Sequence, residues 1–178
     1  VHAVTVLHDS AFGNTAHSSL HLGYRFDHRQ VDRTTTVIYK HQEKTSAGAL
    51  IKNVTFVHLR ASKLFSQTFS RDYFLQYESD PFKLLTRRQL LGVTLRRAWD
   101  LPFLSSFVFS PGVMIDDETV ISEGQSQFVR MTSYVLCQKS FYDRAMVTAT
   151  TYVQPKMADM SDFRVLSEWE FKFPLTER

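Results

Sequence analysis

The sequence of 178 residues contains a single cysteine, Cys137, and no long apolar run. One cysteine excludes an intrachain disulfide framework and a cysteine-rich zinc site. No stretch approaches the roughly 18 consecutive apolar residues that mark a membrane-spanning helix. Basic residues exceed acidic residues only slightly, 21 against 18. No basic run is long enough to suggest nucleic acid as a partner.

What the chain does contain is alternation of apolar and polar residues, which is clearest over residues 163–173. Side chains two residues apart point to the same face of a β-strand. One face of this segment would carry Phe163, Val165, Ser167, Trp169, Phe171 and Phe173, and the other would carry Arg164, Leu166, Glu168, Glu170 and Lys172. Eleven extended residues reach roughly 36 Å, which is long for a strand of a soluble domain. Such a strand, tilted by about 45°, rises about 25 Å, the height of the apolar band of an outer-membrane barrel.

The same pattern predicts about ten strands and no helix. The strands are expected at residues 1–8, 18–27, 34–41, 50–60, 72–78, 85–97, 103–114, 127–139, 145–154 and 163–173. Turn signals such as Gly13-Asn14 and Ser79-Asp80-Pro81 separate them. The polar segments 42–49 and 115–126 are expected to be the longer loops.

These elements predict an all-β fold, an antiparallel up-and-down transmembrane β-barrel formed by residues 1–178 as one domain. About ten strands lie in this chain, and twelve in the full protein is the alternative. The chain opens with the strand-like segment VHAVTV, so an export signal is expected to have been removed or to precede these residues. Whether the last strand pairs with residues 1–8 or with a further strand is left open.

Alternation alone does not decide between a membrane barrel and a soluble barrel. A soluble barrel such as a lipocalin has its apolar face inside, whereas a membrane barrel turns it outward to lipid. Long strands, 15 Phe, 7 Tyr and 2 Trp, and charges of both signs on the polar face favour the membrane. Trp169 in mid-strand and the irregular pattern of residues 50–60 argue against it. We therefore expect the outer membrane of a bacterium, with the lipid bilayer as partner and a protein partner or larger assembly as an open alternative.

Several segments resemble one known family. Gly13, Asn14 and Thr15 match a turn between its first two strands, and Tyr77, Glu78, Asp80, Phe82, Arg88 and Gly92 match its central hairpin. A late segment is matched by Tyr152, Pro155, Asp162, Phe163, Val165, Ser167 and Glu168. These motifs resemble the salt-induced outer-membrane proteins, a bacterial β-barrel family of unknown function. The resemblance implies an outer-membrane barrel and brings no catalytic residues.

The chain departs from the pattern of that family in three respects. It has only 6 glycines, whereas the family is rich in glycine. Ser110 stands where a Gly-Pro-Gly strand of the family has its first glycine, although Gly112 is kept. The chain also stops at LTER, where members of the family continue to a terminal aromatic residue.

No constellation of residues predicts catalysis, a cofactor or a metal site. His17 and His21 are four residues apart, a spacing that pairs side chains on a helix rather than on a strand. His8, Asp9 and Ser10 are adjacent, and neighbours on a strand point to opposite faces. We therefore expect no enzyme. A small outer-membrane lipid-modifying enzyme and a soluble ligand-binding β-barrel remain the alternatives.

The alternation assigns side chains to the two faces of the barrel. Toward the lumen we expect the polar residues Arg88, Arg96, Arg164, Glu168, Glu170 and Lys172, and toward lipid we expect Leu20, Leu22, Val165, Trp169 and Phe171. If both arginines face the lumen, Arg88 and Arg96 could pair with Glu168 and Glu170 and plug a narrow interior. The predicted function is a structural, scaffolding or narrow-pore role in the outer membrane.

Overall fold

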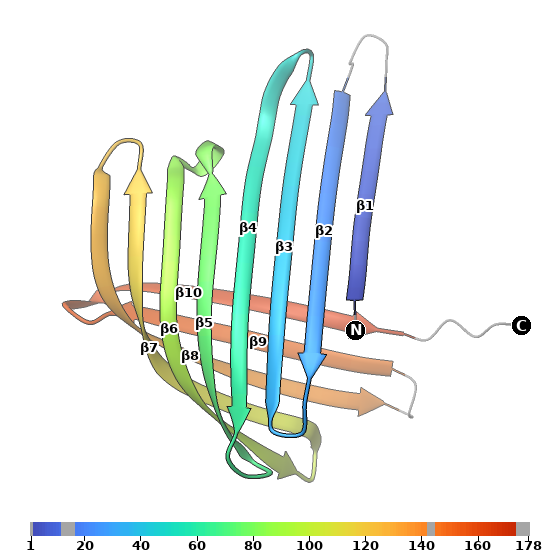
Figure 1. Ribbon diagram of the computed structural model, residues 1–178, viewed down its shortest axis with the longest axis vertical. Helices are drawn as coiled ribbons and strands as arrows, with labels where there is room; N and C mark the ends of the chain where they lie inside the picture. Colours follow the sequence, from blue (N-terminus) through green and yellow to red (C-terminus); the bar gives the residue numbers. More distant parts are fainter. Residues whose placement is uncertain (1, 12–16, 142–144, 174–178) are drawn as a thin grey trace, which may run out of the picture. The chain divides into compact units, whose positions relative to one another are not determined.

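The computed structural model describes residues 2–11, 17–141 and 145–173, which form one antiparallel sheet with ten strands in chain order (Figure 1). The strands are β1 His2–Ala11, β2 His17–Arg29, β3 Arg33–Ser46, β4 Ala49–Leu64, β5 Phe69–Asp80, β6 Leu85–Leu101, β7 Leu104–Val120, β8 Gly124–Phe141, β9 Ala145–Lys156 and β10 Asp159–Lys172. A single 3₁₀ turn, η1 Pro81–Lys83, is the helical element of this part of the chain. No helix among the described residues is long and apolar enough to cross a membrane.

The all-β, antiparallel, up-and-down fold and the ten strands that alternation predicts are confirmed. Two loop predictions are wrong. The segment 42–49 continues β3 to Ser46 and turns over Ala47 and Gly48, both with positive φ, as a two-residue hairpin requires. The segment 115–126 continues β7 to Val120. In both segments the polar composition predicts a loop, whereas the hydrogen-bonded ladder with the neighbouring strand extends well into the polar residues. The predicted turn at residues 12–15 lies outside the described residues.

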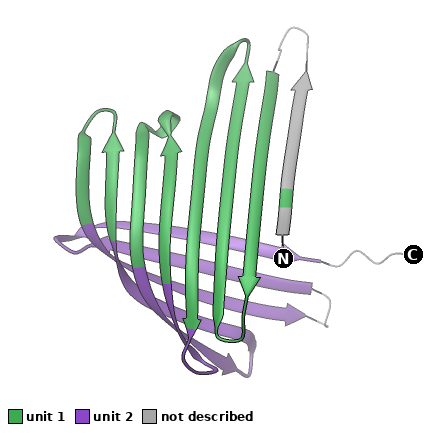
Figure 2. Cartoon of the chain, in the orientation of Figure 1, with its two compact units in different colours: residues 1–63, 73–92, 115–128 green, residues 64–72, 93–114, 129–178 purple. Residues whose placement is uncertain are grey.

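The chain divides into two compact units, drawn in green and purple in Figure 2. Unit 1 comprises residues 1–63, 73–92 and 115–128, and unit 2 comprises residues 64–72, 93–114 and 129–178. In unit 1 the register places Tyr24 opposite Tyr39 and Tyr39 opposite Val57, so apolar side chains of β2, β3 and β4 share a face. In unit 2, β9 and β10 pair with Ala149 opposite Trp169.

Strands β6 and β7 approach each other closely at Gly112 of unit 2. A Cβ atom at this position would overlap the carbonyl oxygen of Val93 and would lie 2.6 Å from Thr94 Cγ2 and 2.7 Å from Thr94 Cα. A side chain there would collide with backbone atoms, which cannot rotate away. Glycine inside a strand commonly marks such an approach, and this explains why Gly112 is kept.

We expect Gly112→Ala to lower the free energy of unfolding by about 1–3 kcal/mol, because the added methyl group must displace the backbone of β6. Urea denaturation of the purified protein, followed by tryptophan fluorescence, measures the change. Ser110→Ala is the matched control, two residues away on the same strand. The Ser110 side chain is fully buried and its hydroxyl has no hydrogen-bond partner among the described residues, so its removal should leave stability unchanged or raised. Equal losses in the two variants would contradict the close approach.

Candidate functional site

Strands β5 to β8 have two faces of opposite character. On β6, Leu91 is 55% exposed and Thr94 is 5% exposed. We define the apolar face of these strands by nine exposed side chains, which are Tyr73, Leu75, Leu91 and Ile115 in unit 1 and Leu95, Phe109, Val113, Val129 and Met131 in unit 2. The polar face is defined by the buried or half-buried side chains that alternate with them, which are Arg88, Asp116 and Glu118 in unit 1 and Ser70, Asp72, Thr94, Arg96, Ser110, Arg130 and Thr132 in unit 2.

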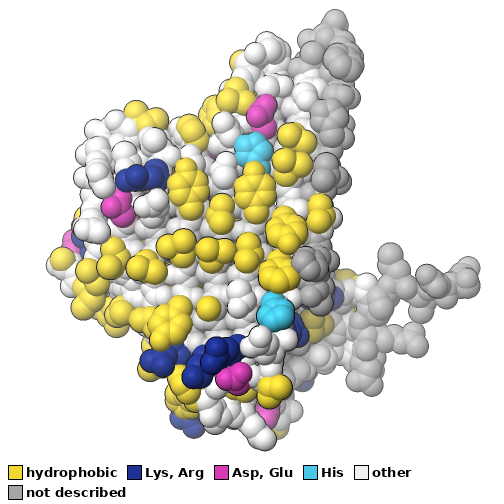
Figure 3. Space-filling view, in the orientation of Figure 1, with side chains coloured by type: hydrophobic (Ala, Val, Ile, Leu, Met, Phe, Trp, Pro, Cys, Tyr) yellow, Lys and Arg dark blue, Asp and Glu magenta, His cyan; other side chains and the backbone are white. Residues whose placement is uncertain are grey.

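This arrangement reverses the usual distribution of polarity. Among the described residues, four hydrophobic side chains are buried, whereas eight polar or charged side chains are buried. Soluble proteins bury charged residues only rarely and only when they are paired. Figure 3 shows rows of apolar side chains on the surface, crossing several strands. The charged and polar side chains are therefore concentrated on the buried polar face. The exposed apolar side chains would be stabilised by an apolar environment.

The first charged cluster of the polar face lies in unit 1. Arg88 of β6 donates through Nε and Nη2 to the two carboxylate oxygens of Asp116 of β7, at 3.1 and 3.2 Å. The Asp116 side chain is completely buried, and Glu118 lies 4.0 Å from Arg88 Nε. A two-pronged guanidinium–carboxylate contact satisfies the charge and the geometry of both groups at once.

The second cluster joins β5 and β6 in unit 2. Arg96 Nε donates to Ser70 Oγ at 2.7 Å and lies 3.8 Å from a carboxylate oxygen of Asp72. Asp72 is buried, and neither of its carboxylate oxygens has a hydrogen bond from the described residues. Arg96 therefore supplies the opposite charge that a buried carboxylate needs, at a distance longer than a hydrogen bond.

The third cluster, also in unit 2, stabilises an irregular pairing. The register of β10 against β9 shifts between Asp159 and Phe163. Arg130, whose side chain is 1% exposed, donates to the Asp162 carboxylate at 3.1 Å and to the carbonyl oxygens of Asp162 and Gln154 at 3.3 and 3.4 Å. A register shift interrupts the regular ladder, and the guanidinium provides donors to carbonyls at that point. Asp162, one of the residues on which the sequence resemblance rests, therefore has a structural role at this point.

Arg88 and Arg96 lie on the polar face, as alternation predicts, but the structure pairs them with Asp116 and Asp72 rather than with Glu168 and Glu170. Glu170 instead contacts Lys172 of its own strand at 3.2 Å. The predicted partners lie on β10, which neighbours β9 in the sheet order and is not adjacent to β6. Asp116 was missed because segment 115–126 was assigned to a loop. The alternation of Val113 and Ile115 with Asp116 carries the signal that identifies it.

Exposure does not separate the two faces of β10 as it does for β5 to β8. Val165, Trp169 and Phe171 are exposed, Trp169 at 66%. The polar residues Glu168, Glu170 and Lys172 of the same strand are exposed as well, and Arg164 is half-buried. Leu20 and Leu22 of β2 are also half-buried. Which of these side chains face lipid and which face the lumen therefore stays a prediction.

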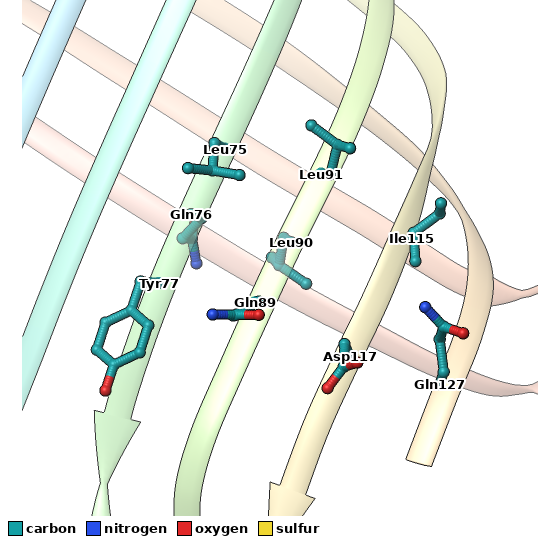
Figure 4. A pocket seen from close by; sticks show the side chains of 9 residues that line it. All are labelled: Leu75, Gln76, Tyr77, Gln89, Leu90, Leu91, Ile115, Asp117 and Gln127. Carbon is teal, nitrogen blue, oxygen red and sulfur yellow. The ribbon is translucent and has the colours of Figure 1, made fainter. Parts of the chain in front are cut away.

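An open pocket of about 350 Å³ lies within unit 1 (Figure 4). Its lining combines the apolar Leu75, Leu91 and Ile115 with Gln89 and Asp117, among others. The Asp117 carboxylate accepts hydrogen bonds from Arg87 at 3.4 Å and from Gln125 at 3.1 Å. The residues lining this pocket include no His, Cys, Ser or Lys, so the pocket lacks a nucleophile–base pair. It has the composition of a boundary between apolar and polar surface.

Metal ligands are not gathered in the part of the chain that the structure describes. No group of three or more His, Cys, Asp or Glu side chains there could hold a metal ion. Cys137 is a half-buried free cysteine on β8.

A family model described as a protein of unknown function, DUF481, matches residues 8–178. The chain belongs to the DUF481 family. The description of the DUF481 family carries no reference to salt induction, so that part of the resemblance stays a prediction. No curated protein matches this DUF481 chain.

A solved structure described as a bacterial polysaccharide outer membrane secretin is similar to this DUF481 chain, with a TM-score of 0.51 and 15% sequence identity. The similarity covers 91% of this chain and 58% of that chain. At this identity the comparison shows a shared fold. The chain spans little more than half of the length of the protein that it matches.

The buried pair of Arg88 and Asp116 generates a test of the polar face. We expect Arg88→Met to lower the free energy of unfolding by about 3–5 kcal/mol, because it leaves a buried carboxylate without its main cation. Urea denaturation measures the loss. The double variant Arg88→Met with Asp116→Asn should lose less, since the fully buried carboxylate is then removed together with its cation. Arg87→Met is the control on the opposite face. Its pair with Asp117 is 40% and 23% exposed, and exposed pairs contribute at most about 1 kcal/mol. A larger loss in the control would show that the faces are inverted.

Proposed function

We propose that this protein is an outer-membrane β-barrel protein of bacteria with a structural, scaffolding or narrow-pore role. The observation that carries the proposal is the reversed polarity of β5 to β8, with apolar side chains exposed and charged side chains buried. A membrane barrel has this arrangement, because its outer surface meets lipid and its lumen holds polar groups. A soluble barrel would have its apolar face inside.

The dimensions of the strands support a membrane location. Strands β5 to β10 have 12 to 18 residues, whereas a transmembrane strand needs about 9–11. On β7 the exposed residues Phe109, Pro111, Val113 and Ile115 succeed one another on one face. This stretch is about 20 Å long at the rise of an extended strand, close to the roughly 25 Å of an outer-membrane apolar band. The strands are therefore long enough to cross and to continue beyond the bilayer.

The similarity to a structure described as an outer membrane secretin supports the outer membrane as the location. In this proposal residues 1–178 belong to one barrel, the bilayer is the main partner, and a partner protein or larger assembly is compatible with a scaffolding role. The polysaccharide named in that description concerns the other protein. Salt induction is not part of the proposal.

The charged clusters favour a narrow or filled lumen over a wide channel. Arg88, Arg96 and Arg130 each reach a carboxylate on another strand, and such pairs occupy the space between strands. Eight-stranded barrels are just filled by side chains, whereas barrels of 16–18 strands hold an aqueous channel. Planar-bilayer conductance distinguishes a narrow pore from a filled barrel. The proposal includes no catalytic role, and no site described above favours one.

We expect the protein to sediment with outer membranes after cell fractionation and to migrate differently in gels before and after heating, because a closed barrel resists unfolding by detergent until it is heated. Immunoblotting of the membrane and aqueous fractions measures the first property. Recovery in the aqueous fraction without detergent would refute the proposal.

A charge on the apolar face provides a second test. Val129→Arg places a cation on the exposed face of β8 and should cost about 2–4 kcal/mol if this position lies near the middle of the bilayer. Folding titrations into lipid vesicles with increasing urea measure the loss. Gln125→Arg is the matched control, since it creates the same residue on the same face of the same strand, four residues nearer to the turn. This control should lower the free energy of unfolding by about 1 kcal/mol at most. A reversed ranking would show that the apolar face does not meet lipid.

A further inference from the structure

Strands β5 and β6 carry two arginines among aromatic rings at one end of their apolar face. We propose that Arg71 and Arg97 bind the phosphate groups of anionic membrane lipids, with the acyl chains of the same lipids on the adjacent apolar face. The inference rests on the proposed function, because it needs the apolar face to meet a bilayer. It adds that the end of β5 and β6 that carries Arg71 and Arg97 contacts the anionic headgroups of the lipids.

The cluster lies within unit 2 and has aromatic rings beside both guanidinium groups. Arg97 Cζ lies 5.0 Å from the ring centre of Trp99 and 5.5 Å from that of Phe69. Arg71 Cζ lies 5.1 Å from the ring centre of Phe65. A guanidinium on an aromatic face is stabilised there by the ring quadrupole, and its N–H groups lie in the plane of the fork, where they can bind a phosphate oxygen.

Position along the strands places both arginines at the same boundary. Arg97 follows the exposed Leu95 by two residues on β6, and Arg71 precedes the exposed Tyr73 by two residues on β5. The two strands are antiparallel, and the backbone N–H of Ala98 donates to the carbonyl oxygen of Thr68 at 2.9 Å. The start of β5 therefore lies beside the end of β6. On the face that carries Leu95 and Tyr73, each arginine is the first charged residue beyond the apolar side chains.

Arg97 has aromatic rings rather than a counter-charge beside it. Within the part of the chain that the structure describes, no carboxylate lies within 4 Å of Arg97, whose contacts are the two aromatic rings. Lys139 of β8 adds a third cation near this end, with Nζ donating to the carbonyl oxygen of Phe103 in the turn between β6 and β7. At the other end of β6, by contrast, Arg87 is paired with Asp117.

Charge complementarity and continuity with the apolar face select a lipid as the occupant. A soluble phosphate would use the arginines but would leave the neighbouring Leu95 and Tyr73 exposed to water. A phospholipid fills both requirements, since its headgroup carries the negative charge and its chains cover the apolar side chains. Aromatic residues are also enriched where a membrane protein passes through the headgroup region.

Quenching of tryptophan fluorescence by brominated lipids tests the inference. The chain has two tryptophans, so Trp169→Phe leaves Trp99, the ring under Arg97, as the reporter. The protein is reconstituted in vesicles of phosphatidylcholine containing either brominated phosphatidylglycerol or brominated phosphatidylcholine in equal amounts. We expect the anionic lipid to quench Trp99 with an apparent affinity about fivefold higher per arginine. High salt should reduce this preference.

The variant Arg97→Gln with Arg71→Gln should abolish the preference, and Arg97→Lys should retain part of it. Arg87→Gln, at the opposite end of β6, is the control and should leave the preference unchanged. Equal quenching by the two lipids in the parent, or a preference that survives loss of both arginines, overturns the inference alone. Absence of quenching by either lipid overturns the proposed function as well, because Trp99 would then not be near a bilayer.

Discussion

Burial of charged side chains is the constraint on which the rest of this structure depends. A buried guanidinium or carboxylate is tolerated only beside its counter-charge, and Arg88 and Arg130 each meet theirs on another strand. These contacts require neighbouring strands to be in the register that brings the two groups together. Because side chains alternate along a strand, a polar face that is fixed in this way turns Leu91 and its neighbours outward. One set of interactions thus determines both the interior and the surface.

The same constraint explains how much of the fold could be predicted. Alternation is local, so it identifies the ten strands and the face of Arg88 and Arg96 without knowledge of their partners. The partner of Arg88 is 28 residues away in the sequence, and no local pattern identifies it. Asp116 and Glu118, read without Arg88, resemble the acidic residues of a loop, which is why the end of β7 was misassigned. Arg130 was missed because its role depends on a register shift between two other strands.

Two of the residues on which the sequence resemblance to the salt-induced outer-membrane proteins rests have structural reasons of different kinds. Gly112 is required by the close approach of β6, and Asp162 by the irregular start of β10. Both contribute to the construction of the sheet. Nothing in the structure explains why Ser110 stands where the resemblance predicts a glycine, since its buried hydroxyl has no hydrogen-bond partner among the described residues. Gly112 and Asp162 therefore have roles in strand packing and strand pairing.

The two ends of β6 differ in a way that bears on orientation. Arg87 is neutralised by Asp117 beside the pocket of Figure 4, whereas Arg97 is held between aromatic rings and keeps its charge available. Between them lie the exposed Leu91 and Leu95, which have no polarity to distinguish one direction from the other. A uniform apolar stretch would fit a bilayer equally well either way up. In the proposed membrane barrel the unequal ends remove that equivalence. Only the end with Arg97 would gain free energy from an anionic surface, so headgroup charge would favour one orientation of the strands.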